Sequence, residues 1–469
     1  MKIAFATLGC KLNYAETSTY ERGLRAAGWE VVSWAARADV YLLNTCAVTE
    51  TAEKKSRNLI RRAHRTAPDA RIAVTGCYAQ LRPDEILALP GVWKVFGADE
   101  KRQIVSAISV FLETEEARAP ESVATLGRPA RANVPLGGQG GGTTLSRDGR
   151  GPESALAERD GWEGSRSDDS GVRASSTAAF GAYSTGERTR SFLKVQDGCD
   201  NFCAYCTVPY ARGRSRSLPL CEVVRMAREI AGQGVKEVVL TGVNTGDYGR
   251  GTGVSFLDLL KALNEVDGIE RFRISSIEPN LITPEIVDWI ASGTKFQPHF
   301  HIPLQSGSDE LLRRVGRRYD TALFASRIDY IRQAFEAPGK PLVFFGIDVI
   351  VGLPGETEEL FEETYRFLKE RIRPAFLHVF PYSRRPGTRA AAWPDQVAER
   401  IKAERVARLE ALSDELHAGF VAANKGIRTG VLWESAQKGG LMGGYTANYI
   451  RLERPFDASR INQLEEVTL

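Results

Sequence analysis

A group of three cysteines in the middle of the chain constrains its fold most, because one loop must wrap around a shared ligand. Cys199, Cys203 and Cys206 have the spacing Cys-x3-Cys-x2-Cys. Thiolates this close together can bind three irons of a [4Fe–4S] cluster, since soft sulfur ligands suit iron. A zinc site is the alternative, but zinc prefers four ligands and no further Cys or His follows nearby. The spacing therefore predicts a cluster with one iron left open for chemistry.

Strand-like and helix-like segments alternate around and after this triplet. The strand-like runs cover 190–195, 235–242, 271–277, 298–304, 341–352 and 375–382, and helix-like segments lie near 219–233, 255–265, 283–292, 320–336 and 357–371. This alternation predicts an α/β fold, a (β/α)6 partial barrel whose active site lies at the carboxyl ends of the strands. Asn244, Ser276 and Gln305 stand at such ends. They are candidate ligand contacts, although Gly and Ser there can also serve only the turns.

Three further cysteines, Cys10, Cys46 and Cys77, are far apart but share a context. Each ends a strand-like run, in KIAFATLGC, ADVYLLNTC and RIAVTGC, with helix-like stretches at 15–27 and 50–66 between them. Strands linked in this way form a parallel sheet whose carboxyl ends share one edge, so the three thiols can converge. Buried structural cysteines are the alternative. Their equivalent positions predict a second three-cysteine cluster site.

The rest of the chain divides into an insertion and a small carboxyl-terminal module. Residues 113–187 are rich in Gly, Ser and Arg without apolar periodicity, which predicts a disordered insertion. A helix is expected over 395–424, followed by short strands punctuated by glycine that predict a small β-barrel. The expected domains are therefore 1–112 and 188–423, with the insertion between them, and the barrel at 424–469.

Several basic and aromatic residues are candidate RNA contacts. Arg212, Arg214 and Arg216 follow the triplet, while Tyr449 and Arg451 lie in the predicted barrel. Small barrels with stacking aromatics and basic grooves often bind single-stranded RNA. Packing of the aromatics and solvation of the arginines are the alternatives. The net charge of +3 is small, so contact with nucleic acid must come from local patches of this kind.

The cysteine count and the hydropathy bear on the compartment. Seven cysteines fit no disulfide framework, and no apolar run approaches the length of a membrane span. The first apolar run, in MKIAFATLGCK, is too short for a signal peptide. We therefore expect a cytoplasmic protein without membrane partners, in a reducing environment that an oxygen-sensitive cluster needs.

The triplet resembles that of the radical S-adenosylmethionine (SAM) superfamily. Tyr205 matches an aromatic position often seen there, and the polar strand ends resemble the SAM-binding surface. The resemblance implies that SAM chelates the open iron through its amino and carboxylate groups. One electron from the cluster, supplied by a donor such as flavodoxin or ferredoxin, then splits SAM into methionine and a 5′-deoxyadenosyl radical.

Outside the insertion, nearly the whole chain resembles the methylthiotransferase family. The stretches that carry the resemblance include LGCKLNYAE, NTCAVTETAEKKSR, TGCYAQ, QDGCDNFCAYCTVPYARGRSRS and DVIVGLPGET, and YTANYIRL is similar to the RNA-binding TRAM domain. The family implies two [4Fe–4S] clusters. The cysteines at 10, 46 and 77 hold the one where a first SAM methylates sulfur, and a second SAM yields the radical that acts on adenine C2.

Three stretches, QDGC, HFHIPLQSGS and HVFPYSRRPGT, look most like the branch that acts on N6-threonylcarbamoyladenosine at position 37 of tRNA. One departure is Gly316, where the family more often has Asn. Two alternatives keep the reaction but change its acceptor, to N6-isopentenyladenosine or to a ribosomal-protein aspartate. A third is of another class, a non-catalytic iron–sulfur sensor that binds RNA.

Overall fold

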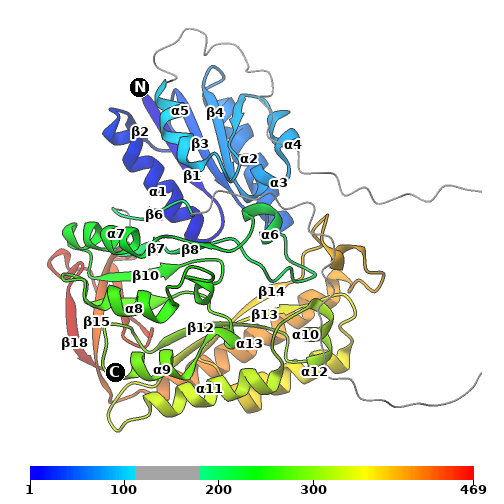
Figure 1. Ribbon diagram of the computed structural model, residues 1–469, viewed down its shortest axis with the longest axis vertical. Helices are drawn as coiled ribbons and strands as arrows, with labels where there is room; N and C mark the ends of the chain where they lie inside the picture. The colour runs from blue at the N-terminus through cyan, green and yellow to red at the C-terminus, as the bar shows by residue number, and fades with distance from the viewer. Residues whose placement is uncertain (111–178, 187–188) are drawn as a thin grey trace, which may run out of the picture.

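In the computed structural model, which describes residues 1–110, 179–186 and 189–469, a parallel sheet forms the amino-terminal domain (Figure 1). Its order is β2-β1-β3-β4-β5. The strands are β1 (Lys2–Thr7), β2 (Glu30–Val32), β3 (Val40–Thr45), β4 (Arg71–Gly76) and β5 (Val92–Val95). All neighbouring pairs are parallel, as the alternation of strand-like and helix-like segments predicts.

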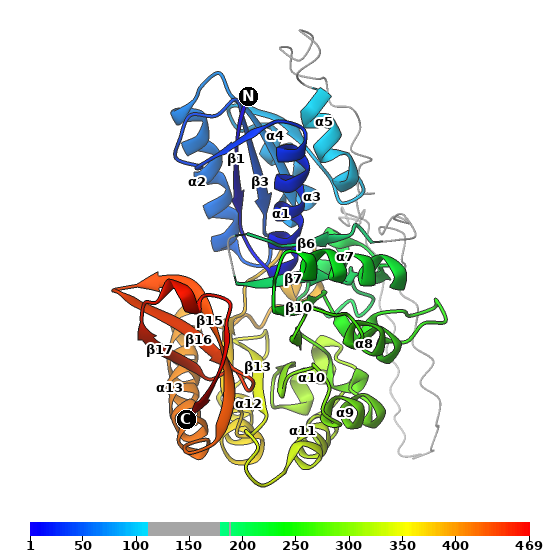
Figure 2. The ribbon, with the colours of Figure 1, turned by 90° about the vertical axis from the view of Figure 1, so that its left-hand side faces the viewer.

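Helices cover both faces of this sheet (Figure 2). They are α1 (Lys11–Ala26), α2 (Glu50–Thr66), α3 (Cys77–Leu81), α4 (Pro83–Leu87) and α5 (Ile104–Val110), with a 3-10 turn at Lys101–Gln103. Tyr20 and Leu24 of α1 pack with Ile104 on one face, and Ile60 of α2 packs with Ile86 of α4 on the other. Because the strands carry apolar side chains on both faces, the sheet needs cover on both.

Six parallel strands form the central domain. They are β7 (Arg190–Lys194), β10 (Glu237–Thr241), β11 (Arg271–Ile274), β12 (His299–Gln305), β13 (Phe344–Val351) and β14 (Phe376–Pro381). Hydrogen bonds group them as β11-β10-β7 and β12-β13-β14. A bridge between Phe272 and Phe296, and a 3.1 Å bond from Ile277 N to His301 O, join the two groups at β11 and β12. The predicted (β/α)6 partial barrel is confirmed.

The helices of the central domain pack around these strands. They are α6 (Val208–Arg212), α7 (Leu220–Gly232), α8 (Phe256–Asn264), α9 (Pro284–Ala291), α10 (Asp309–Val315), α11 (Thr321–Phe335), α12 (Glu358–Arg366) and α13 (Glu399–Ala423). A π-helical turn, Phe367–Ile372, extends α12, and two short strands, β8 (Gln196–Asp197) and β9 (Arg216–Ser217), pair near the triplet. Within the described residues, no helix is long and apolar enough to cross a membrane.

Most of the predicted insertion lies outside the described residues. Its last part, residues 179–186, is described and belongs to the fold. There β6 (Ala182–Tyr183) pairs antiparallel with β7, and Ala182 is fully buried. The prediction of disorder is therefore wrong for these residues, because a segment of eight residues is too short to show an apolar periodicity.

The carboxyl-terminal module is a curled antiparallel sheet in the order β17-β16-β15-β18. The strands are β15 (Arg428–Lys438), β16 (Leu441–Thr446), β17 (Arg451–Pro455) and β18 (Leu464–Thr468). Val431, Trp433 and Met442 form its small core. The module is docked by Arg273 of β11, which donates to Thr446 O at 2.8 Å and Ala447 O at 2.9 Å. Its likeness to a TRAM domain stays a prediction.

Candidate functional site

The three amino-terminal cysteines follow adjacent strands of one sheet. Cys10 is the residue before α1, Cys46 directly follows β3, and Cys77 begins α3 directly after β4. Since β1, β3 and β4 are neighbours in the sheet, the three residues lie at one edge, as predicted. Electrostatic interactions of Cys46 with both Cys77 and Cys10 also place the thiols near one another. We call this group the sheet-edge cysteines.

Two glycines with left-handed backbone let the chain turn tightly at this edge. Gly76 has φ +97°, and a Cβ there would lie 2.3 Å from Thr45 O. Gly9 has φ +106°, and a Cβ there would lie 3.0 Å from the Sγ of Cys46. Asn13 links the neighbouring loops, because its Nδ2 donates to Leu8 O at 2.8 Å and to Thr45 O at 2.9 Å. The close approach of these loops forms a cradle that admits no side chain at either glycine.

The thiols of the sheet-edge cysteines are partly withdrawn from water. Burial raises the pKa of Cys46 to about 12, and the charge of Cys77 adds to this effect. Burial also raises the pKa of Cys77, while Arg212 acts in the opposite direction. If these thiolates bound iron, the metal itself would stabilise them, together with Arg212. Two buried cysteines, the exposed Cys10 beside them and a nearby cation suit an iron–sulfur cluster.

The triplet loop holds its sulfurs with backbone and side-chain donors. Asn201 N lies 3.5 Å from the Sγ of Cys199, and Val208 N lies 3.4 Å from the Sγ of Cys206. Arg317 donates from Nη1 to the Sγ of Cys203 at 3.2 Å. Burial raises the pKa of Cys199 and of Cys206 to about 12. Donors aimed at all three sulfurs suit a cluster, because hydrogen bonds to cluster sulfurs set its reduction potential.

A cavity of about 290 Å³ lies against the triplet. Every predicted SAM contact is in its wall, namely Tyr205, Asn244, Ser276 and Gln305. Asn244 is buried and its Nδ2 has no hydrogen-bond partner among the described residues. An unpartnered donor that faces a cavity suits a ligand that carries an acceptor. We call this space the first cavity.

The first cavity also contacts the sheet-edge loops. Val48 and Thr49, which come shortly after Cys46, line it together with the triplet. The cavity therefore extends from the triplet to the loop that follows Cys46, while the sheet-edge cysteines themselves are not among its lining residues.

Sequence reasoning missed two charged residues of this cavity. Glu278 accepts from Asn201 Nδ2 at 2.8 Å and forms an ion pair with Arg317 at 2.7 Å. Arg317 follows Gly316, whose left-handed φ of +79° ends α10 and turns the chain toward the triplet. The sequence signals were present, as Glu278 stands at a strand end and Arg317 lies in an arginine run. Neither signal shows that the two side chains meet.

A group of polar side chains from β12, β13 and β14 reaches the first cavity, because Asp348 is in its wall. His301 Nε2 lies 2.6 Å from Asp348 Oδ1, and the ring of His378 stacks on His301 with centroids 4.8 Å apart. Their ligand atoms lie within 4.8 Å of one another, so they can also hold a metal ion. Burial lowers the pKa of His378 to about 4, and His301 adds to this effect. His378 is therefore neutral at physiological pH.

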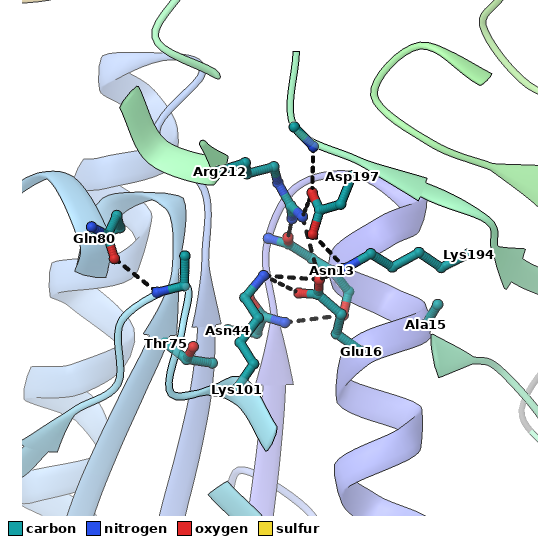
Figure 3. Close-up of polar contacts among 12 residues, drawn as sticks. Asn13, Ala15, Glu16, Asn44, Thr75, Gln80, Lys101, Lys194, Asp197 and Arg212 are labelled. Carbon is teal, nitrogen blue, oxygen red and sulfur yellow. Dashed lines mark hydrogen bonds and ion pairs between the residues drawn. The ribbon is translucent and has the colours of Figure 1, made fainter. Parts of the chain in front are cut away.

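A buried ion-pair network joins the amino-terminal domain to the barrel (Figure 3). Glu16 of α1 pairs with Lys101 at 2.8 Å, Lys194 at 2.6 Å and Arg212 at 3.3 Å. Asp197 pairs with Lys194 at 2.6 Å and Arg212 at 2.9 Å. Burial alone would raise the pKa of Glu16, but the surrounding cations hold it well below its usual value. We call these five residues the interdomain network.

The predicted RNA contacts have different surroundings. Arg214 and Arg451 are exposed, with pairs to Asp200 at 3.7 Å and Glu453 at 2.9 Å. Arg212 is only 3% exposed and belongs to the interdomain network. Its predicted contact with RNA is therefore wrong, because charge in a sequence does not reveal burial. The side chain of Arg216 is 8% exposed and lies beside Asp197 at 3.7 Å, which also places it inside the protein.

Tyr449, the remaining predicted RNA contact, lies neither among the exposed arginines nor in the interdomain network. It has a left-handed φ of +67° and a ring 4.5 Å from that of His299, so it faces the barrel interior. The remaining cysteine, Cys221, is exposed on α7 and joins neither cysteine group.

Residues 2–97 match the model of uncharacterized protein family UPF0004, and residues 193–368 match that of the radical SAM superfamily. A Bacillus subtilis (strain 168) protein named threonylcarbamoyladenosine tRNA methylthiotransferase MtaB is 39% identical over 456 residues. That alignment covers 96% of this chain and 89% of the relative. A protein of the same name from Aquifex aeolicus (strain VF5) is 36% identical to this chain, and the alignment covers 97% of each of the two chains.

A further relative carries a different name. The tRNA-2-methylthio-N(6)-dimethylallyladenosine synthase of Nitratidesulfovibrio vulgaris (strain Hildenborough) is 32% identical, with 92% of this chain and 86% of the relative covered.

Among solved structures, the radical SAM methyltransferase TsrM from Kitasatospora setae has a TM-score of 0.53 at 15% identity. It covers 83% of this chain and 74% of that one. This likeness concerns the fold alone.

Proposed function

Because the chain belongs to the family of radical SAM tRNA methylthiotransferases, we propose that it modifies N6-threonylcarbamoyladenosine in tRNA. It replaces the hydrogen on C2 of the adenine by a methylthio group, at position 37 beside the anticodon. One observation carries the proposal. The triplet lines a cavity whose wall also includes Val48 and Thr49, shortly after the sheet-edge cysteine Cys46, so a base bound there lies near both the proposed radical source and the proposed sulfur source.

The cysteines supply the ligands for two [4Fe–4S] clusters. Cys199, Cys203 and Cys206 hold one, and the sheet-edge cysteines hold the other. When bound, the clusters and SAM supply the radical that removes the C2 hydrogen and the sulfur that takes its place. The chain's own part is to position and enclose these groups. Asn244 and Gln305 offer amide groups to SAM in the first cavity, where Tyr205 and Ser276 also lie.

The RNA must present an unstacked base to this enclosed site, as enzymes that act on bases commonly require. Arg214 and Arg451 are exposed cations that suit phosphate contacts on the way to the cavity. Tyr449 offers an aromatic face inside the barrel. An electron donor such as flavodoxin or ferredoxin reduces the triplet cluster, and the protein works in the reducing cytoplasm.

The experiment that tests the function is a nucleoside profile of tRNA from a strain lacking the gene. Mass spectrometry is expected to show loss of 2-methylthio-N6-threonylcarbamoyladenosine and accumulation of its precursor. Complementation with the wild-type gene restores the product, whereas a triple alanine variant of the triplet does not. Persistence of the product in the deletion strain, with no second enzyme of this family in the genome, contradicts the assignment.

The alternatives are separated with purified, reconstituted protein. Anticodon stem-loops that carry threonylcarbamoyladenosine or isopentenyladenosine are offered in parallel with the ribosomal protein. We expect methylthio transfer to the first RNA only. A non-catalytic sensor predicts that the reduced protein forms no 5′-deoxyadenosine from SAM, so formation of this compound excludes that alternative.

A further inference from the structure

A second cavity, of about 500 Å³, shares no lining residue with the first cavity. Its wall includes Cys10 and Lys11 at the start of α1, inward-facing residues of the barrel strands, and Tyr449 of the carboxyl-terminal module. All three parts of the protein therefore meet around it. Its volume is in the range of small-molecule sites. Because Cys10 is a sheet-edge cysteine, a group bound there lies next to the proposed sulfur source.

Positive charge predominates in this cavity. The cations are Lys11, Arg190 and Arg273, and the one acidic residue among the lining residues is Glu21. Glu21 is already paired with Arg25 at 2.8 Å. A cavity lined in this way favours an anionic ligand.

Two of the three cations already have partners. Arg190 pairs with Glu434 at 2.9 Å, and Arg273 pairs with Glu237 at 2.8 Å. Lys11 differs, because it forms no hydrogen bond or ion pair with any residue that the structure describes. Asp348 is the carboxylate whose charge acts on Lys11, but its Oδ1 is taken by His301 at 2.6 Å. A cation held in a cavity without a partner is costly until an anion joins it.

The rest of the wall suits a group attached to a flat base. Tyr14 and Phe192 lie edge to face with centroids 5.8 Å apart, and Tyr449 stacks on Tyr445 at 4.7 Å. His299 is partly buried beside Tyr449, and its Nδ1 has no partner among the described residues. The cavity thus combines aromatic walls, one unpaired cation and one unused ring nitrogen. An uncharged hydrocarbon substituent would leave both polar groups unpaired.

We propose that the second cavity binds the carboxylate of the threonylcarbamoyl group, with Lys11 as its counter-ion. This inference rests on the proposed function, because it assigns the part of that substrate which sets it apart from isopentenyladenosine. Lys11 is thereby a specificity-determining residue next to the proposed sulfur source. His299 and Tyr449 border the substituent on the side of the carboxyl-terminal module.

The test compares binding of two stem-loop RNAs that differ only in this charge. One carries threonylcarbamoyladenosine, and the other carries its uncharged methyl ester. Affinity is measured by fluorescence anisotropy with reconstituted holoenzyme. Contacts to the RNA backbone are common to both, so the ratio of the dissociation constants isolates the carboxylate. A hydrogen bond between charged groups predicts a preference of about tenfold to a hundredfold for the acid.

Three variants locate the preference. Lys11→Met is expected to remove it, and Lys11→Arg to keep most of it, since the positive charge remains. Lys54→Met, on the exposed face of α2, is the matched control and is expected to keep it in full. Iron content and the visible absorption spectrum confirm that each variant is folded and loaded. The affinity for SAM is measured in parallel, since SAM also carries a carboxylate.

The outcomes are distinct. If wild type shows no preference for the acid, or Lys11→Met retains it, the proposal is overturned. A loss of SAM affinity in Lys11→Met also overturns it, because the carboxylate at Lys11 is then that of SAM. Mass spectrometry of the same wild-type reactions tests the proposed function separately. If methylthio product forms but the protein shows no preference for the acid over the methyl ester, only the proposed role of the second cavity is overturned. If the protein prefers the acid but forms no methylthio product, only the proposed function is overturned.

Discussion

The two cysteine groups differ in how the chain builds them. The triplet lies in one loop between β8 and α6, so its spacing is written in a single stretch of sequence. The sheet-edge cysteines come from three separate loops, and only the order β1-β3-β4 brings them together. The first group depends on local chain geometry, whereas the second depends on the folding of the whole amino-terminal domain. We therefore expect the second group to be more sensitive to changes elsewhere.

Their supports differ in the same way. The sulfurs of the triplet receive donors from Asn201 in the loop, from Val208 at the start of α6, and from Arg317 of the same domain. The sheet-edge cysteines are backed by Arg212, which belongs to the barrel and is held by the interdomain network. The proposed sulfur source thus depends on a contact between domains.

The largest expected effects come from removing one ligand of each group. Cys203→Ala is expected to abolish both SAM cleavage and methylthio transfer, because both need the triplet cluster. Cys46→Ala is expected to abolish transfer but to keep SAM cleavage. Each variant is expected to lose about four irons per chain. Iron analysis and quantitation of 5′-deoxyadenosine and modified RNA distinguish the two. Equal loss of SAM cleavage in both variants would contradict separate roles.

The next effect concerns the interdomain network. Arg212→Met removes one of the cations that neutralise the buried carboxylates of Glu16 and Asp197, which is expected to cost about 3–5 kcal/mol in the free energy of unfolding. Arg371→Met is the control, because its pair with Asp329 is half exposed. It is expected to cost less than about 1 kcal/mol. Urea denaturation of the two proteins measures the difference. If Arg212→Met lost iron equally from the triplet and from the sheet-edge cysteines, a closer link between Arg212 and the sheet-edge cysteines would be contradicted.

A smaller effect separates two glycines with left-handed backbone. Gly76→Ala places a Cβ against Thr45 O and adds backbone strain, which is expected to cost about 1–3 kcal/mol and to impair loading of the sheet-edge site. At Gly316 a Cβ has room, with Arg389 at 3.5 Å. Asn tolerates this backbone, so Gly316→Asn is expected to cost less than about 1 kcal/mol. Thermal denaturation and iron content test both. Similar losses of stability and iron in Gly76→Ala and Gly316→Asn would contradict a special requirement for glycine at position 76.

The smallest effect is a dependence on pH. The pKa of Glu16 is lower in the folded protein than its ordinary value of 4.5. Its ion pairs therefore stabilise the fold fully above that value, and this contribution is lost as the pH falls below it. Urea denaturation of metal-free protein at falling pH is expected to show a smaller decrease for Glu16→Gln than for wild type. If the free energy of unfolding fell equally with pH in both proteins, the ion pairs of Glu16 would not contribute to this pH dependence.

The sequence predicts some parts of this molecule better than others, for physical reasons. Cys10, Cys46 and Cys77 could be placed at one edge because parallel connectivity follows from alternating strands and helices. Strand ends could likewise supply Asn244 and Gln305. Lys194 and Glu16 pair across 178 positions of sequence, and no periodicity encodes such a contact. Arg212 was misassigned for the same reason. Short elements such as α10 and β6 carry too few apolar residues to leave a pattern.

The interdomain network has a consequence for the order of events during turnover. Opening the interface would expose five mutually paired charges at once, so hinge motion between the two domains is expected to be small. Because the two domains are expected to move little, the nucleotide must move to bring its base into the site. The rate is then expected to follow the ease with which the anticodon loop releases its base, and loops with weakly stacked neighbours are expected to be modified fastest.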